Sequence, residues 1–357
     1  MIGLHNAHKS VARHVIGRET AKKVLSPLLR WDRPKPGQLT DGWSLILGAP
    51  WDLRAILDVN LMFLDRVDRT GLSAIHVVFD RMHRDGMDQV AEEARQRWPD
   101  LPMRFHHYRG MAGKLVEKID VSTFYNSMNC SIALAAMDTQ YAVLHDFDLY
   151  PLRPDHFTRL IDRMRNEQLH FCGVERTRYD GLGQDDNVLG TWGLGMDVGW
   201  LRSNWKPIDI FHRVERIRGE MVMLDPFASV QLRTDKRELV AEPSDEDFCH
   251  VRNLCSTYLR FTRQQPVKIA WRLHYLWYLE ALSEHRTLEP IVAQMAEATS
   301  RRLSVDGIDQ DFEGVDPTCA NVLRDELFRM DTVIHGDVQD ATRAFVEGFA
   351  TFLERTA

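Results

Sequence analysis

The sequence predicts an α/β fold in which a mostly parallel sheet is flanked by helices and followed by a helical C-terminal extension. Short apolar runs alternate with segments of helical periodicity between residues 43 and 174, which is typical of a parallel sheet covered by helices. Residues 267–282 are apolar almost all round, as in a buried helix. We expect three consecutive parts: a basic helical arm and linker over 1–40, an α/β domain over 41–265 and a helical region over 266–357.

The elements are expected in a regular order. Apolar side chains form a first strand over Trp43–Gly48, and their spacing changes to that of a helix from Pro50 to about Asp68. A second strand covers Ala74–Phe79 and ends at Asp80 and Arg81. The further expected elements are a helix over 86–98, a strand over Met103–His107, a helix over Phe124–Thr139, a strand over Tyr141–Leu144, a helix over His156–Asn166, a strand over Leu169–Val174, and amphipathic helices over 288–301 and 339–354.

Composition narrows the class of protein. The 357 residues are 44% hydrophobic and 27% charged, which excludes a disordered or low-complexity chain, and the net charge of −7 argues against a nucleic-acid binder. There is no apolar run long enough for a membrane span, and no signal-peptide pattern. The five cysteines contain no C-x-x-C pair, so neither a disulfide framework nor a cysteine zinc site is expected. We therefore expect a cytoplasmic protein.

Charge is distributed unevenly along the chain. Residues 1–35 carry eight Lys or Arg and only two acidic residues. This arm can contact an anionic lipid surface, an acidic partner or water. We expect peripheral contact with the inner face of the membrane through residues 1–35, and packing of the arm on its own domain is the alternative. A homodimer is considered as well.

Two acidic residues follow the apolar strand Tyr141–Leu144. Asp146 and Asp148 lie where ligands bind in open α/β sheets, beyond the carboxyl end of a strand. Because they are two residues apart on an extended segment, their side chains share one face. Two carboxylates that approach a phosphate need a cation between them, and Mg²⁺ or Mn²⁺ suits oxygen ligands and diphosphate. The alternative is a solvated acidic pair in a loop.

The surrounding block, Tyr125–Pro151, resembles metal-dependent glycosyltransferases of the GT-A fold, in which an Asn-bearing helix precedes an apolar strand that ends in Asp-x-Asp. The Asn (Asn126 or Asn129) and the proline after the acids are similar to the glucuronyltransferase-like branch. The resemblance implies that Asp148 binds the metal bridging the donor diphosphate. Asp146 is expected to share the metal or to lie nearer the donor ribose or sugar.

A second block resembles family 2 glycosyltransferases and polypeptide GalNAc-transferases. An acid opens a short helix that ends in Arg, here Asp225 to Arg233, and Pro243 and His250 follow. Residues 190–202 resemble the glycine-rich acceptor-side segment of these enzymes. The resemblance implies that His250 is a metal ligand and that Asp225 is the catalytic base. These enzymes usually carry two adjacent acids here, whereas this chain has Leu224 before Asp225 and keeps only one.

Other roles come from the same resemblance or from residue type. Family analogy places the nucleotide at the ends of the first two strands, where a carboxylate can accept the N–H of a uracil or guanine edge. Trp192 is expected to stack on the sugar ring. Asp225 can also be read as a helix N-cap before Pro226, and its rivals as base are Asp185, Asp186 and Glu175. The predicted donor-binding residues are Ala49, Pro50, Asp52, Asp80, Arg81, Asn129, Asp146 and Trp192.

The resemblance implies an enzyme of the hexosyltransferase type. It would move a sugar from a nucleotide-sugar, a UDP-sugar in the first instance, to a hydroxyl of a glycan or lipid-linked acceptor, with Mn²⁺ or Mg²⁺ as cofactor. One alternative is a nucleotidyltransferase of sugar metabolism, for which residues 48–54 are a poor version of the usual Gly-rich loop. The other alternative is a non-catalytic scaffold with the GT-A fold.

Overall fold

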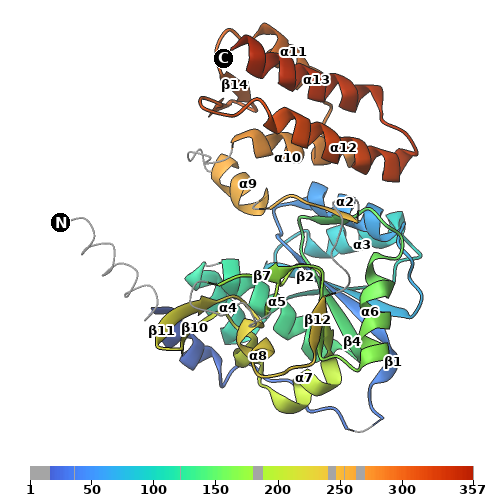
Figure 1. Cartoon of the computed structure of the whole chain (residues 1–357), viewed down its shortest axis with the longest axis vertical. Helices are drawn as coiled ribbons and strands as arrows, with labels where there is room; N and C mark the ends of the chain where they lie inside the picture. The colour runs from blue at the N-terminus through green and yellow to red at the C-terminus, as the bar shows by residue number, and fades with distance from the viewer. Residues whose placement is uncertain are drawn as a thin grey trace, which may run out of the picture. The chain divides into compact units, whose positions relative to one another are not determined.

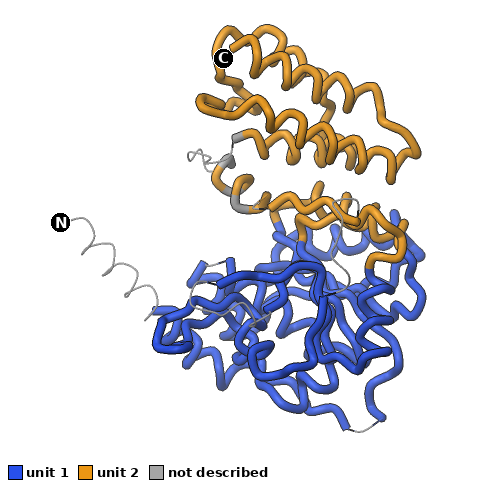
Figure 2. Tube along the Cα trace, in the orientation of Figure 1, with its two compact units in different colours: residues 1–51, 68–146, 157–243 blue, residues 52–67, 147–156, 244–357 orange. Residues whose placement is uncertain are grey.

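The computed structural model describes residues 17–35, 37–120, 122–179, 188–239, 247–252, 254–262 and 270–356. The chain divides into two compact units, and each consists of three segments (Figure 2). Unit 1 takes residues 1–51, 68–146 and 157–243, and unit 2 takes 52–67, 147–156 and 244–357. The sequence predicted three consecutive parts, and its boundary at residue 265 lies outside the described residues.

Unit 1 is built on a seven-stranded sheet (Figure 1). The strand order is β12-β6-β9-β4-β1-β2-β3, and all neighbours are parallel except β9, which runs antiparallel to both β4 and β6. The predicted, mostly parallel α/β sheet is therefore confirmed. Its elements are β1 (Thr40–Ala49), β2 (Leu72–Met82), α3 (Met87–Arg97), β3 (Met103–Tyr108), α4 (Gly110–Ile119), α5 (Ser122–Ala136), β4 (Thr139–His145), α6 (His156–Glu167), β6 (Phe171–Gly173), β7 (Arg176–Thr177), β8 (Val188–Leu189), β9 (Leu194–Asp197), α7 (Val198–Asn204), η1 (Pro207–Ile210), β10 (Arg213–Ile217), β11 (Glu220–Leu224), α8 (Ala228–Gln231) and β12 (Arg237–Leu239).

The two faces of the sheet follow from alternation along β1. Ile46 belongs to the main core cluster with residues of α5, and Gly48 lies against Asn129 of the same helix. On the opposite face, the Trp43 ring lies 5.8 Å from the ring of Phe157 in α6. Successive side chains of a strand point to opposite faces, so helices can cover both sides of this central strand.

The described end of the basic arm is part of unit 1. Residues 17–25 form a helix in which Leu25 is fully buried in the main core cluster. Lys22 is buried as well, and its Nζ donates to the carbonyl oxygen of His212 at 3.1 Å. Packing on its own domain, the alternative considered for the arm, therefore describes residues 17–25. Residues 1–16 lie outside the described part of the chain.

Unit 2 combines a small amount of strand with helices. Its elements are α2 (Arg54–Leu64), β5 (Leu149–Pro151), β13 (Phe248–His250), α9 (Leu254–Thr262), η2 (Ala270–Arg272), α10 (Leu273–Leu282), α11 (Glu289–Glu297), β14 (Arg302–Val305), β15 (Ile308–Asp311), α12 (Cys319–His335) and α13 (Asp340–Arg355). Every residue from Leu273 to Leu279 is buried, which confirms the predicted buried helix. Helix α10 contacts α2, α9 and α12, and this explains why no face of it is polar. In the described part of the chain, no helix combines the length and apolar character needed to span a membrane.

Several element boundaries differ from the predicted ones for local reasons. The helix expected from Pro50 begins only at Arg54, because the Trp51 amide donates to the Asp80 carboxylate at 3.1 Å and the chain turns there. The helix expected to reach Thr139 ends at Ala136, because Thr139 pairs with Thr40 as the first residue of β4. Helix α4 and the β14–β15 hairpin were not expected from the sequence, whereas α12 falls in the region expected to be helical.

The buried His274 makes the stability of unit 2 dependent on pH. Its ring centroid lies 3.7 Å from that of Phe349, and complete burial lowers the pKa of His274 to about 3. The unfolded chain binds this proton near pH 6.5, so the free energy of unfolding falls by about 1.4 kcal/mol for each pH unit between about 6.5 and 3. We expect His274→Phe to remove this contribution to the slope. Between pH 8 and pH 4.5, the free energy of unfolding of the variant should therefore rise by about 2 to 3 kcal/mol relative to that of the wild type.

Urea denaturation at the two pH values measures this difference. His335→Phe changes an exposed histidine at the end of α12 and serves as the control, for which we expect the wild-type slope. A wild-type slope in His274→Phe would show that His274 is not the group that takes up the proton.

Candidate functional site

Three parallel strands of unit 1 end at the same edge of the sheet. The registers pair His145, the last residue of β4, with Leu47 and pair Ala49, the last residue of β1, with Phe79, so the ends of β4, β1 and β2 are staggered by two to three residues along one edge of the sheet. Asp146 follows β4 directly at this edge, and Asp80 lies in β2 just beyond the last residue that pairs with β1. The carboxyl ends of parallel strands are where open α/β sheets bind their ligands.

The acid pair meets the predicted histidine. Strand β13 pairs antiparallel with β5, and this brings His250 opposite Leu149, one residue after Asp148. The Nε2 atom of His250 lies 3.5 Å from Oδ1 of Asp148, and both side chains are largely buried. Asp146, Asp148 and His250 each offer one ligand atom, and these atoms lie within 4.8 Å of one another.

The Asp148 carboxylate is held in place by the backbone. Its Oδ2 accepts a hydrogen bond from the Leu254 amide at 3.2 Å, and its carbonyl oxygen accepts one from the Val251 amide at 2.9 Å. These bonds leave Oδ1 directed at His250. The orientation of this carboxylate is therefore fixed by the segment that carries the histidine.

The donor set fits a divalent transition ion. Two ligand atoms that are each about 2.1 Å from an octahedral ion lie about 3 to 4.2 Å apart, and the 3.5 Å between Asp148 and His250 falls in that range. Carboxylate oxygens suit both Mg²⁺ and Mn²⁺, whereas an imidazole nitrogen is a better ligand for Mn²⁺ and the later divalent metals than for Mg²⁺. Asp148 and His250 are therefore spaced to share Mn²⁺, and a carboxylate oxygen of Asp146 lies within 4.8 Å of both ligand atoms.

Asp225, the predicted base, lies between β11 and α8 and is half-buried. The Tyr179 hydroxyl donates to its Oδ2 at 3.2 Å, and its amide donates to the Tyr179 oxygen at 3.4 Å. Burial, reinforced by the Asp225 carboxylate, raises the pKa of Tyr179, so the phenol keeps its proton and remains a donor. Tyr179 was not among the predicted residues, because no motif links two positions 46 residues apart.

The predicted nucleotide-binding pair lies inside β2 rather than after it. Asp80 is buried and accepts a hydrogen bond from the Trp51 amide, and Arg81 pairs with its carboxylate at 3.4 Å. The Arg81 guanidinium also lies 4.7 Å from the centroid of the Tyr125 ring. Tyr125 in turn stacks with Tyr108 at 6.3 Å. The Asp80 carboxylate and the Arg81 guanidinium are thus held at this edge of the sheet, and Tyr125 is supported from behind by the fully buried Tyr108.

Asn129 is buried at the middle of α5, directly beneath β1. Its Oδ1 accepts a hydrogen bond from the Tyr108 hydroxyl at 2.9 Å. A Cβ at Gly48 would lie 2.5 Å from its Nδ2. The side chain therefore supports the end of β1, and its donor-binding role stays a prediction.

This close approach makes Gly48 sensitive to substitution. In Gly48→Ala the new methyl group would displace Asn129 and break its bond to Tyr108, so we expect a loss of about 1 to 3 kcal/mol in the free energy of unfolding. Gly17→Ala is the control, because a Cβ there meets no atom within 4 Å. Urea denaturation measures both variants. Combining Gly48→Ala with Asn129→Ala identifies the clash, because the double variant lacks the side chain that the new methyl group displaces. Wild-type stability of Gly48→Ala would contradict it.

The remaining predicted residues are spread over unit 1 and the first turn of unit 2. Ala49 is fully buried, Pro50 is half-buried, and Asp52 is exposed in the turn before α2. Trp192 is half-buried, and its Nε1 lies close to Gly190. Glu175 contributes its carbonyl oxygen to the Gly190 amide at 2.9 Å. Asp185 and Asp186, the rival bases, lie outside the described residues.

No family model and no curated protein matches the chain. Solved structures resemble it at low identity. The mannosyltransferase PcManGT from Pyrobaculum calidifontis, in complex with GDP-Man and Mn²⁺, has 15% identity and a TM-score of 0.41 over 99% of this chain and 96% of that one. TarS 1–349 of S. aureus in complex with UDP has 13% identity and a TM-score of 0.39 over 88% and 90%. A 4-diphosphocytidyl-2C-methyl-D-erythritol synthase from Anaerococcus prevotii has 12% identity and a TM-score of 0.35 over 58% and 89%. At this level of similarity, function has to be argued from the residues of this chain.

Proposed function

We propose that this protein is a metal-dependent glycosyltransferase that uses a nucleotide-sugar donor, in the first instance a UDP-sugar. The observation that carries the proposal is the ligand set formed by Asp146 and Asp148, which follow strand β4, and His250, the last residue of β13. Two carboxylates and one imidazole at the ligand-binding edge of a parallel sheet suit an ion that binds a diphosphate.

The three ligands would hold Mn²⁺, with Mg²⁺ as the weaker substitute. The bound ion would supply charge neutralisation for the departing nucleoside diphosphate. Asp148 is oriented for this role by the Leu254 amide, and His250 by the pairing of β13 with β5. Metal binding needs a neutral imidazole and ionised carboxylates, so affinity for the metal is expected to fall as the pH is lowered.

Asp225 is the proposed base. In a transfer with inversion, its carboxylate takes the proton of the acceptor hydroxyl while that oxygen forms a bond to the anomeric carbon and the bond to the diphosphate breaks. The Tyr179 hydroxyl fixes one carboxylate oxygen of Asp225 and leaves the other for the acceptor. Trp192 is proposed to stack on the sugar, and Asp80 with Arg81 is proposed to bind the nucleotide.

A product assay separates this function from its alternatives. The purified protein is incubated with Mn²⁺ and either nucleotide-sugars, among them UDP- and GDP-sugars, or nucleoside triphosphates with sugar phosphates. A glycosyltransferase releases nucleoside diphosphate from a nucleotide-sugar, by transfer or slow hydrolysis. Release of pyrophosphate from a triphosphate would instead identify a nucleotidyltransferase, and the absence of both together with no thermal shift by any nucleotide would favour a scaffold.

We also propose that the acceptor is a hydroxyl of a glycan or of a lipid-linked sugar. A cytoplasmic enzyme that meets a lipid-linked acceptor would contact the inner membrane face peripherally through residues 1–35. Because Leu25 belongs to the core of unit 1, a deletion up to Thr40 would disturb the fold, and point variants are the better test. Size-exclusion chromatography with light scattering tests the homodimer.

A further inference from the structure

The hairpin of β10 and β11 has one buried and one outward face. Val222 and Leu224 belong to a small core cluster with Val188 and Ala228. The register pairs Val214 with Met223 and Arg216 with Met221. Because cross-strand partners lie on the same side of a ladder, these four side chains form the outward face.

Apolar side chains on this outward face are unusually exposed. Met221 is 66% exposed and Met223 is 51% exposed. The outer side of a two-stranded hairpin normally carries polar residues. Methionine is flexible and polarizable, and it is used where a protein surface contacts an apolar partner of variable shape.

The N-terminal helix lies beside the hairpin and lines a cavity with it. In Figure 1 its blue ribbon lies beside β10 and β11, and a cavity of about 300 Å³ is lined by Val214 of the hairpin and by Lys22 and Lys23 of the helix. On this helix and the turn after it, Val24 is 52% exposed and Leu28 is 43% exposed. Because residues four apart in helical geometry share one side, Val24 and Leu28 lie together, on a different side of the helix from Lys22 and Lys23, which line the cavity shared with the hairpin. We call residues 17–30 together with the outward face of the hairpin the helix–hairpin surface.

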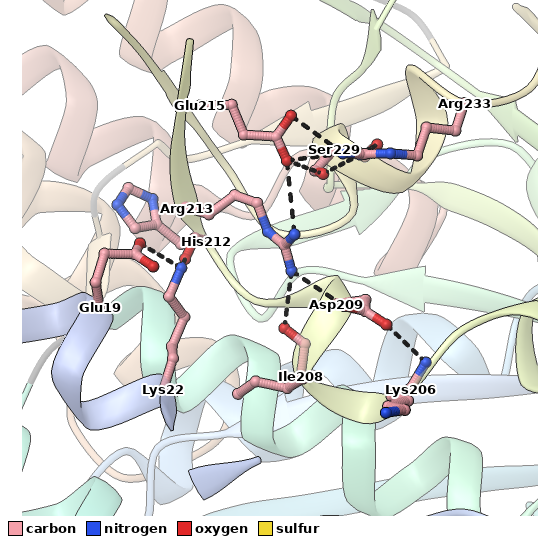
Figure 3. Close-up of polar contacts among 10 residues, drawn as sticks. All are labelled: Glu19, Lys22, Lys206, Ile208, Asp209, His212, Arg213, Glu215, Ser229 and Arg233. Atoms are coloured by element: carbon pink, nitrogen blue, oxygen red, sulfur yellow. Dashed lines mark hydrogen bonds and ion pairs between the residues drawn. The ribbon is translucent and has the colours of Figure 1, made fainter. Parts of the chain in front are cut away.

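A network of charged groups holds the helix–hairpin surface together (Figure 3). Lys22 pairs with Glu19 and donates to the His212 carbonyl, which directly precedes β10. Arg213 donates to the Ile208 carbonyl at 3.2 Å and lies 3.5 Å from Glu215, which also pairs with Arg233 after α8. The helix, the hairpin and α8 are therefore fastened to one another, and the surface is preformed.

The charge of this surface opposes that of the whole chain. Residues 17–30 and 213–224 carry seven Lys or Arg and three Glu, whereas the chain has a net charge of −7. Lys23, Arg216 and Arg218 are exposed, and two of the three acids, Glu19 and Glu215, pair with cations of the same surface. These two segments therefore carry a net charge of +4 (seven minus three) around the exposed apolar side chains.

We infer that the helix–hairpin surface docks on an anionic lipid bilayer. Met221 and Met223 would enter the boundary between headgroups and acyl chains, and Lys23, Arg216 and Arg218 would lie at the level of the anionic headgroups. The phosphates of a nucleic acid would bind the cations, but a nucleic acid would not account for the exposed methionines. A second copy of the chain would bring like charges together. The inference extends to the hairpin the membrane contact proposed above for residues 1–35 and rests on that proposal, whereas the product assay with nucleotide-sugars tests the catalytic function separately.

Co-sedimentation of the full-length protein with vesicles tests this inference. We expect binding to vesicles of phosphatidylglycerol and phosphatidylcholine at low salt, and loss of binding in 0.5 M salt or on pure phosphatidylcholine. Each cation near the surface contributes about a fivefold increase in partitioning, so Lys23→Glu combined with Arg216→Glu should weaken binding by at least about 25-fold. Met221→Ser combined with Met223→Ser should weaken it by about tenfold.

Matched controls lie in unit 2. Arg302→Glu reverses an exposed cation on β14, and Val322→Ser removes an exposed apolar side chain on α12; both should bind vesicles as the wild type does. Circular dichroism and the nucleotide thermal shift show that each variant is folded. Wild-type binding by both double variants would overturn the inference. A second result would also overturn it: the wild type binds single-stranded RNA but not vesicles, and the double variants lose the binding to RNA.

Discussion

Asp148→Asn is expected to abolish Mn²⁺-dependent nucleotide binding and to lower turnover at least about 1,000-fold. The amide keeps the shape of the side chain and an oxygen that can accept the Leu254 amide, so the local fold is preserved. It removes the negative charge that the ion and the diphosphate need, and charge stabilisation of this kind is usually the largest contribution to such a reaction. Calorimetric titration of UDP with and without Mn²⁺ measures the loss.

Asp309→Ala is the control for this substitution, because Asp309 is an exposed acid on β15 in the same unit. It should retain wild-type affinity for UDP with Mn²⁺. His250→Ala should shift the metal preference from Mn²⁺ toward Mg²⁺, since only oxygen ligands remain. Unchanged UDP affinity of Asp148→Asn in the presence of Mn²⁺ would remove the metal assignment.

Asp225→Asn is expected to lower kcat by about 100- to 10,000-fold while the KM for the donor changes little. An amide cannot accept the acceptor proton, and loss of a general base has an effect of this size. Tyr179→Phe should lower kcat by about tenfold, because it removes the hydrogen bond that orients the carboxylate, and such a bond contributes about 1 kcal/mol.

The control for the base is Asp235→Asn, which changes an exposed acid ten residues downstream. Donor hydrolysis in the absence of acceptor uses water, and it should fall less in Asp225→Asn than transfer to an acceptor does. If Asp225→Asn lowered donor affinity and left kcat unchanged, Asp225 would be a binding residue and the base would have to be sought elsewhere.

The sheet could be predicted because buried parallel strands are short continuous apolar runs with polar residues at their ends. Trp43–Gly48 and Tyr141–Leu144 are such runs, and both fall within strands of the central sheet. The same regularity placed Asp146 and Asp148 at the ligand-binding edge. Helix α4, by contrast, begins at Gly110, and its first turn has no capping side chain, so no start signal marked it.

The contacts that assemble the site could not be derived from periodicity, because they depend on pairings between distant segments. The meeting of His250 with Asp148 depends on the three-residue strands β5 and β13. The contact of Tyr179 with Asp225 depends on packing around the β10–β11 hairpin. Short strands and loop contacts leave no periodic pattern in the sequence, so His250 and Asp225 were indicated only by the resemblance of residues 225–250 to a family motif, and Tyr179, which lies outside that motif, was not indicated.

The interleaving of the two units affects how the chain can fold during synthesis. Helix α2 leaves the ribosome more than 200 residues before α10, the helix it packs against. Strand β5 covers part of α2 earlier, with the Tyr150 ring 5.4 Å from that of Phe63, but the part of α2 that packs on α10 stays uncovered until α10 is available. Contacts of such large sequence separation form slowly and leave intermediates prone to aggregation. A gene fragment that stops before residue 270 should therefore yield insoluble protein, and recombinant production would depend on the full-length chain and on chaperones that shield α2.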